Sequence, residues 1–191
     1  RSSAASDVYK RQALNTVYFQ IDESNKAPRR TLEMISELLR YQLYGGNQKV
    51  SILQEIDYLK TYIALRKLRM SERLRLRVEF PPELNELNIY PLLFLPLVEN
   101  AFKYVGGDYQ LDIIMKWENN RISLFIRNSI PELSAEDEAL RKSVDERQRK
   151  GIGLVNLRRR LSLLYPNKHR LETRKEETEF VAELMIEIED I

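Results

Sequence analysis

The spacing of apolar residues changes near residue 72, and this change constrains the fold more than any other feature of the sequence. Before it, apolar residues recur every three or four positions, which predicts amphipathic helices. After it, apolar and charged residues alternate from Arg73 to Phe80, which predicts a half-buried strand that ends at Pro81. We therefore expect an α+β chain in which a helical part precedes a part built around a sheet.

Two helices are predicted in the first part. One begins near Pro28 and ends before Gly45, and the other starts after Ser51 as N-cap and continues to about Arg69. A short loop joins them, so they should form an antiparallel hairpin. Because such a hairpin buries too little apolar surface to be stable alone, we expect it to pack on a second copy, as a dimeric four-helix bundle, or on the following domain.

The second part mixes predicted strands and helices. Asn119 and Asn120 lie between two alternating segments and predict the turn of a β-hairpin. The charged stretch over residues 131–150 has no clear apolar stripe and is typical of a functional lid or a disordered loop. The other expected elements are a helix over Leu92–Tyr104, strands over Leu111–Trp117 and Arg121–Arg127, a helix over Leu154–Leu164 and a last strand over Phe180–Ile188.

Composition excludes several kinds of site. The chain has no cysteine, which excludes disulfides, thiolate nucleophiles and cysteine zinc sites. His169 is the only histidine, which excludes a multi-histidine metal centre and disfavours most hydrolase mechanisms. The net charge of +2 gives no strong field for nucleic acid. No apolar run approaches the roughly 18 to 20 residues needed to span a bilayer.

A run of three arginines, Arg158–Arg160, raises the alternative of a nucleic-acid surface. Successive residues of a helix point in different directions, so these side chains cannot form one basic stripe. We therefore expect no nucleic-acid partner.

Two polar clusters could carry chemistry. Glu99, Asn100 and Lys103 lie at i, i+1 and i+4 of a predicted helix and share one side of it, whereas Val98 and Phe102 face the core. The alternative is a surface ion pair between Glu99 and Lys103, which contributes about 0.2 to 0.5 kcal/mol. The second cluster, residues 151–156, has two glycines where the charged stretch enters a helix. Backbone N–H groups there could approach phosphate oxygens, or the glycines could simply soften a loop.

In their order, these clusters resemble sensor histidine kinases of the LytS/YehU type. Pro-Leu-Val-Glu-Asn-Ala-Phe-Lys-Tyr, which ends at Tyr104, looks like the N box of that family, and Gly-Ile-Gly-Leu-Val-Asn-Leu-Arg-Arg-Arg-Leu from Gly151 looks like its second glycine box. Leu38–Tyr44 and Glu55–Ile63 match its dimerisation region. The resemblance covers about Ala13 to the end. It implies dimerisation helices over residues 13–71, followed by an ATP-binding catalytic domain, a GHKL (Bergerat) α/β sandwich, over residues 72–191.

The resemblance also implies ATP and Mg²⁺ as cofactors and gives roles to individual residues. Asn100 would bind Mg²⁺ through its amide oxygen, and Glu99, as the catalytic residue, would orient a water on the metal or accept a proton. Lys103 would offset phosphate charge. Asn128 stands where related kinases carry an adenine-reading aspartate, and its carbonyl can still accept a hydrogen bond from the adenine amino group. The other implied ATP-binding residues are Tyr104, which stands where many members have histidine, and Gly151, Ile152, Gly153, Leu154, Asn156 and Arg160.

The implied function is that of the ATP-binding catalytic region of a two-component sensor histidine kinase, which transfers the γ-phosphate of ATP to a histidine and then to a response regulator. We expect a homodimer through residues 28–69. The segment should lie in the cytoplasm without contacting the membrane, and its full-length parent should be anchored in the cytoplasmic membrane. The alternative is a GHKL-type nucleotide-binding interaction module, or pseudokinase, without phosphotransfer.

The chain departs from the family at the phospho-acceptor motif. The family has Pro-His-Phe-Leu-Phe-Asn before Ala-Leu-Asn, so counting back from Ala13 puts Val8 at the histidine position and Gln12 at the asparagine. Residues 1–12 are expected to be a non-native or disordered leader. His169 cannot replace the missing histidine, because it is expected in a solvated turn after Pro166, far in sequence from the dimerisation helices. The chain should therefore bind ATP without phosphorylating itself.

Overall fold

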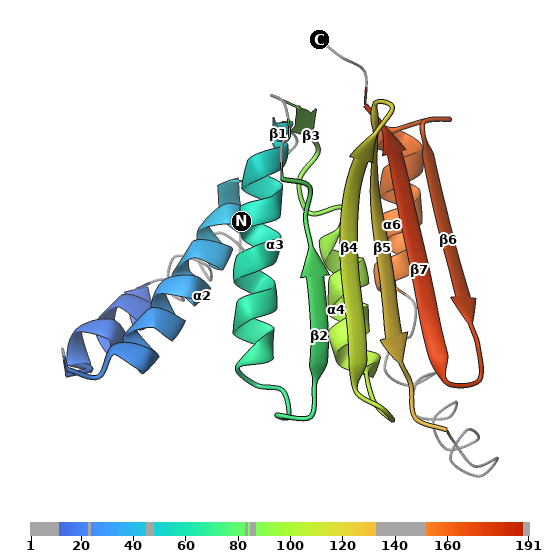
Figure 1. Ribbon diagram of the computed structural model, residues 1–191. Helices are drawn as coiled ribbons and strands as arrows, with labels where there is room; N and C mark the ends of the chain where they lie inside the picture. The colour runs from blue at the N-terminus through green and yellow to red at the C-terminus, as the bar shows by residue number, and fades with distance from the viewer. Residues whose placement is uncertain are drawn as a thin grey trace. The chain divides into compact units, whose positions relative to one another are not determined.

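The computed structural model describes residues 12–22, 24–44, 48–82, 84, 87–132 and 152–188. These residues belong to two compact units (Figure 1). Unit 1 is formed by the chain up to Met70 together with Asn88–Leu92, and unit 2 by Ser71–Leu87 and the chain from Leu93 onward. Val8 and the charged stretch from residue 133 lie outside the described residues. No helix within the described ranges is long and apolar enough to cross a bilayer.

Unit 1 contains the predicted helical hairpin. Its elements are a helix over residues 12–20, α2 (Lys26–Tyr44), β1 (Val50–Ser51), α3 (Ile52–Lys67) and β3 (Asn88–Ile89). Ser51 caps α3 as predicted: its side chain accepts a hydrogen bond from the Leu53 N–H, and the Gln54 side chain accepts one from the Ser51 N–H. β1 pairs antiparallel with β3, so the short segment that contains β3 groups with the helices.

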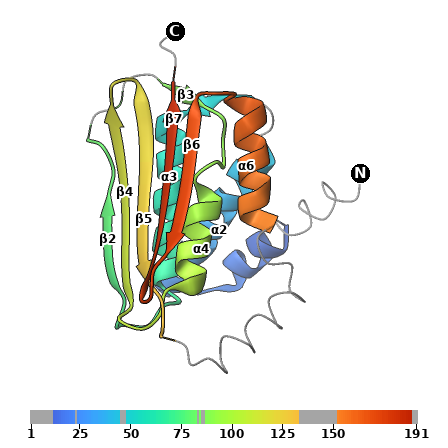
Figure 2. The ribbon, with the colours of Figure 1, turned by 90° about the vertical axis from the view of Figure 1, so that its right-hand side faces the viewer.

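Unit 2 is a five-stranded sheet with helices on one face. Its elements are β2 (Arg75–Glu79), α4 (Leu95–Tyr104), β4 (Gln110–Glu118), β5 (Arg121–Ser129), α6 (Ile152–Leu164), β6 (His169–Lys175) and β7 (Glu179–Glu187). The strand order is β2-β4-β5-β7-β6; β2 runs parallel to β4, and the other pairings are antiparallel. Figure 2 shows α4 and α6 on one side of this sheet. Ile113, Leu124 and Leu184 on the inner face are almost fully buried, which places the core between sheet and helices.

Two turns test the sequence predictions. Asn119 and Asn120 have φ angles of 51° and 58°, the left-handed conformation that a type I′ hairpin turn requires, as predicted. His169 does not lie in a solvated turn: it is half-buried and begins β6, with its Nδ1 2.7 Å from the carbonyl oxygen of Tyr165. A carbonyl only accepts, so this bond requires the proton on Nδ1. Apolar spacing does not predict β6, because this edge strand has a single buried residue, Leu171. Its apolar and polar residues do not alternate clearly.

Candidate functional site

The polar side of α4 faces away from the core. Its inward positions are buried, Val98 completely, as the sequence predicts. Glu99 and Lys103 are exposed and Asn100 is half-buried, so a ligand can reach all three side chains from solvent. Tyr104, the last residue of α4, is half-buried, and Lys103 Nζ lies 4.9 Å from the centre of its ring. This contact between a cation and an aromatic ring favours a position of the ammonium group near the carboxyl end of α4.

Ser129 ties the end of β5 to the loop that follows α4. Its Oγ donates to the carbonyl oxygen of Gly106 at 2.6 Å and accepts from the Gln110 N–H at 2.9 Å. Its carbonyl oxygen accepts from the Gly106 N–H at 3.0 Å. The approach requires glycine: a Cβ on Gly106 would lie 2.8 Å from Cδ of Pro131, and Gly107 has a φ of +58°. Sequence reasoning misses Ser129, because a serine within a strand has no distinguishing spacing.

Asn128 contributes a buried acceptor beside this junction. The residue is 1% exposed, and its Nδ2 donates to the Ser129 carbonyl oxygen at 3.2 Å. That bond sets the orientation of the amide, because the opposite orientation would bring two acceptors together. Oδ1 is buried and has no hydrogen-bond partner among the described residues. An unsatisfied buried acceptor costs about 1 to 3 kcal/mol, so this atom suits a ligand that supplies an N–H donor.

α6 carries the remaining predicted residues. It packs against α4, and Figure 2 shows both helices on the same face of the sheet. A Cβ on Gly153 would meet no atom of the described residues within 4 Å, so the space beside this glycine is open with respect to them. Gly151 lies outside the described residues, and Ile152 is described only as the first residue of α6. Of the other predicted positions, Gly153 and Asn156 are exposed, and Leu154 and Arg160 are half-buried.

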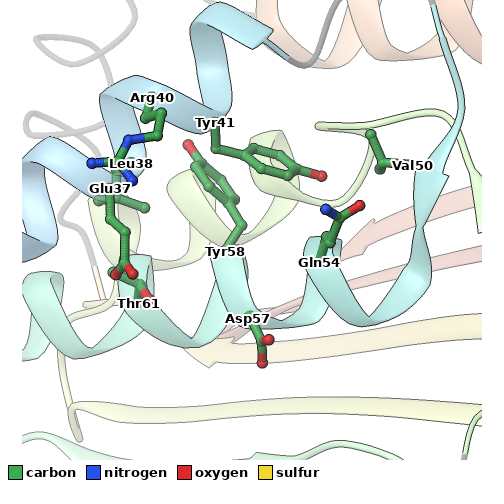
Figure 3. A pocket seen from close by; sticks show the side chains of 9 residues that line it. All are labelled: Glu37, Leu38, Arg40, Tyr41, Val50, Gln54, Asp57, Tyr58 and Thr61. Carbon is green, nitrogen blue, oxygen red and sulfur yellow. The ribbon is translucent and has the colours of Figure 1, made fainter.

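A groove elsewhere in the molecule is not this site. It lies in unit 1 between α2 and α3, and Figure 3 shows the Tyr41 and Tyr58 rings in its wall. None of the residues predicted to bind ATP lines it. The candidate site in unit 2 is therefore defined by its polar groups and not by this groove.

Comparison with known proteins gives a match to a sequence family and matches to individual proteins. Residues 12–74 match the family described as histidine kinase. The sensor protein kinase HptS of Staphylococcus aureus (strain USA300) is 26% identical over 163 residues, which are 83% of this chain and 32% of HptS. The chain is thus similar in sequence to sensor histidine kinases. The chain spans about a third of the length of the curated relatives that it matches.

Solved structures provide a comparison of the fold. Full-length ShkA in complex with AMPPNP matches with a TM-score of 0.50 and 14% identity, over 97% of this chain and 45% of that one. The histidine kinase AdeS of Acinetobacter baumannii matches with a TM-score of 0.47 and 15% identity, over 98% of each chain. The α+β architecture with a mixed sheet backed by helices, as the resemblance implied, is confirmed.

Proposed function

We propose that unit 2 binds ATP with Mg²⁺ and serves as the catalytic region of a two-component sensor histidine kinase. The proposal rests on Oδ1 of Asn128, which is buried and has no hydrogen-bond partner in the described part of the chain. The 6-amino group of adenine is a donor of the required kind, and Asn128 occupies the position at which related kinases read that group. The sequence relatives, which are sensor kinases by name, support the same function.

Residues of α4 and α6 fit the phosphate part of the nucleotide. Lys103 carries a positive charge, and the first N–H groups of α6 lack partners within the helix, so both favour phosphate oxygens. Bound ATP would supply the transferable γ-phosphoryl group. Within the described residues no group of three or more histidine, aspartate or glutamate side chains could hold a metal ion. The Asn100 amide oxygen would therefore share Mg²⁺ with the phosphates, and Glu99 would orient a water or accept a proton nearby.

The proposal also covers phosphotransfer, dimerisation and membrane anchoring in the whole protein. In it, phosphate would pass to a histidine and then to a response regulator, and homodimers would form through residues 28–69. This cytoplasmic part would belong to a parent anchored in the cytoplasmic membrane. In the same proposal, residues 13–71 form the dimerisation region and residues 72–191 the ATP-binding domain.

Replacing Asn128 with leucine should remove recognition of the adenine amino group. Leucine has a similar volume but no acceptor, so we expect ATP affinity to fall by about tenfold, the effect of one hydrogen bond of average strength. Inosine triphosphate, which lacks the amino group, should bind equally weakly to both proteins. Isothermal titration with the two nucleotides measures this. Equal affinity of the wild-type chain for ATP and inosine triphosphate would contradict the assignment of Asn128.

The chain itself should not become phosphorylated on histidine. Val8 stands at the acceptor position, so incubation with labelled ATP should leave no acid-labile phosphate on the purified protein. Its detection would show that another residue accepts the phosphoryl group.

The absence of histidine at position 8 also favours the second candidate, an interaction module without phosphotransfer. A chain with Val8→His and Gln12→Asn, supplied as acceptor in trans, distinguishes the two. Label on that acceptor supports a kinase, and a bound nucleotide that never yields label supports the module.

A further inference from the structure

The Glu55 carboxylate joins three parts of unit 1. Glu55 lies on α3 and is 0% exposed. Its Oε2 accepts a hydrogen bond from the Tyr41 hydroxyl of α2 at 2.5 Å and another from the Leu92 backbone N–H at 3.0 Å. A buried carboxylate is tolerated only where hydrogen bonds replace its hydration. These bonds therefore determine where the carboxylate lies.

The tyrosine side of this junction is held by ring stacking and a hydrogen bond. The Tyr41 and Tyr58 rings stack with centres 4.6 Å apart (Figure 3), and Gln42 Nε2 donates to the Tyr58 hydroxyl at 2.8 Å. Burial and the nearby Glu55 carboxylate raise the pKa of Tyr41 far above its usual value. The Tyr41 hydroxyl thus stays protonated and donates to Glu55. The hairpin therefore holds the carboxylate from one side.

The other side of the junction is the end of the segment Asn88–Leu92. Leu92 has a φ of 59°, a left-handed conformation that is unfavourable for a residue with a Cβ and persists only where its surroundings fix it. The fully buried Ile89 pairs with Val50 of β1, so the segment is already held three residues earlier. The bond to Glu55 fixes its last residue.

Leu92 is also the last residue before the chain enters unit 2. Leu93 and Phe94, which follow, are both 0% exposed, and α4 begins at Leu95. The Phe94 carbonyl oxygen accepts from the N–H groups of Leu97 and Val98 in the first turn of α4. Only two tightly packed residues thus separate Leu92 from this turn.

We propose that Glu55 is a positioning residue for the candidate ATP site: through the Leu92 N–H it fixes the backbone from which α4 starts. The inference rests on the proposed function, because α4 carries Glu99 and Asn100. It makes the helical hairpin a determinant of ATP binding. Any rearrangement of α2 against α3 that draws the carboxylate away from Leu92 would loosen the start of α4.

The test compares Glu55→Met with Tyr41→Phe by amide hydrogen exchange, residue by residue, without nucleotide. Methionine matches the length of glutamate but has no acceptor oxygen, whereas Tyr41→Phe removes one partner of Glu55 and leaves its bond to Leu92. In Glu55→Met, the amides of Leu92, Leu97 and Val98 should exchange about tenfold faster, the effect of losing one hydrogen bond. In Tyr41→Phe they should exchange as in the wild type, and Glu55→Gln, which keeps an acceptor oxygen, should restore the wild-type rates.

Unchanged exchange at Leu97 and Val98 in Glu55→Met would overturn the proposal. The proposal would also be overturned if the Leu92 amide of the wild-type chain exchanged as fast as an exposed amide. This measurement does not depend on whether any variant folds. ATP affinity provides a second readout: it should fall in Glu55→Met and not in Tyr41→Phe, and equal affinities in Glu55→Met and wild type count against the role of Glu55. If the wild-type chain binds no ATP, the proposed function fails, while the exchange rates still decide whether Glu55 holds the start of α4.

Discussion

Replacing Asn100 with alanine is expected to weaken the binding of ATP with Mg²⁺ by about 10- to 100-fold. The amide oxygen is the side-chain group proposed to share the metal with the phosphates, and contacts to charged groups contribute about 1.5 to 3 kcal/mol each. Asn100 is half-buried on the surface of α4 and faces away from the core, so the fold should not change. Isothermal titration of the two proteins at the same Mg²⁺ concentration measures the difference.

Two comparisons separate the metal from other effects of Asn100→Ala. Asn100→Asp keeps an oxygen at this position and should lose much less affinity. With EDTA in place of Mg²⁺, the wild type and Asn100→Ala should bind ATP equally well. A loss of affinity of the same size with and without Mg²⁺ would show that Asn100 contacts the nucleotide and not the metal.

Replacing Leu161 with alanine should destabilise unit 2 by about 2 to 5 kcal/mol, because it creates a cavity beneath α6. Leu161 is 0% exposed and lies on the side of α6 that faces the core. The free energy of unfolding, measured with urea, reports this loss. Since α6 carries several of the proposed nucleotide contacts, ATP should also raise the stability of the variant less than that of the wild type.

Leu163→Ala is the matched control on the same helix. Leu163 is 71% exposed, so its truncation removes little buried surface and should change the free energy of unfolding by less than about 0.5 kcal/mol. Equal costs at the two positions would mean that the exposed side of α6 is covered in solution, as it would be in a larger assembly.

Long periodic segments made much of this fold predictable. α2, α3 and the strand pair β4–β5 follow from apolar spacing, because burial of one face requires that spacing. Ser51 and the two asparagines at 119 and 120 follow from local chemistry: a hydroxyl caps a helix, and asparagine tolerates positive φ. These features depend on residues that are near one another in sequence.

Features that depend on distant residues were not predictable in the same way. β1 and β3 have two residues each, too few for any period, and they form because Val50 meets Ile89. The sequence predicts that the helix before the glycine loop begins at Leu92, whereas α4 begins at Leu95 and Leu92 has a positive φ. That conformation depends on a carboxylate 37 positions away in sequence, which no local pattern reveals.

In the candidate site, too, features set by residues near in sequence were predictable and features set by packing were not. The helical spacing of Glu99, Asn100 and Lys103 was enough to place them on one side of α4. The orientation and burial of the Asn128 amide could not be predicted from the sequence. Its orientation depends on the hydrogen bond to the Ser129 carbonyl oxygen, and its burial depends on the packing of β5. The positions in the charged stretch before α6, Gly151 among them, remain predictions.

The path of the chain between the two units restricts how such a protein can evolve by recombination. The chain passes between units three times, after Met70, after Leu87 and after Leu92, so neither unit is one uninterrupted stretch of gene. A single crossover near residue 71 would join a β1 from one ancestor to a β3 from another. Because Ile89 is fully buried and pairs with Val50, both short strands would have to suit each other from the first generation. We therefore expect the hairpin and the sheet to be inherited together when neighbouring domains are exchanged.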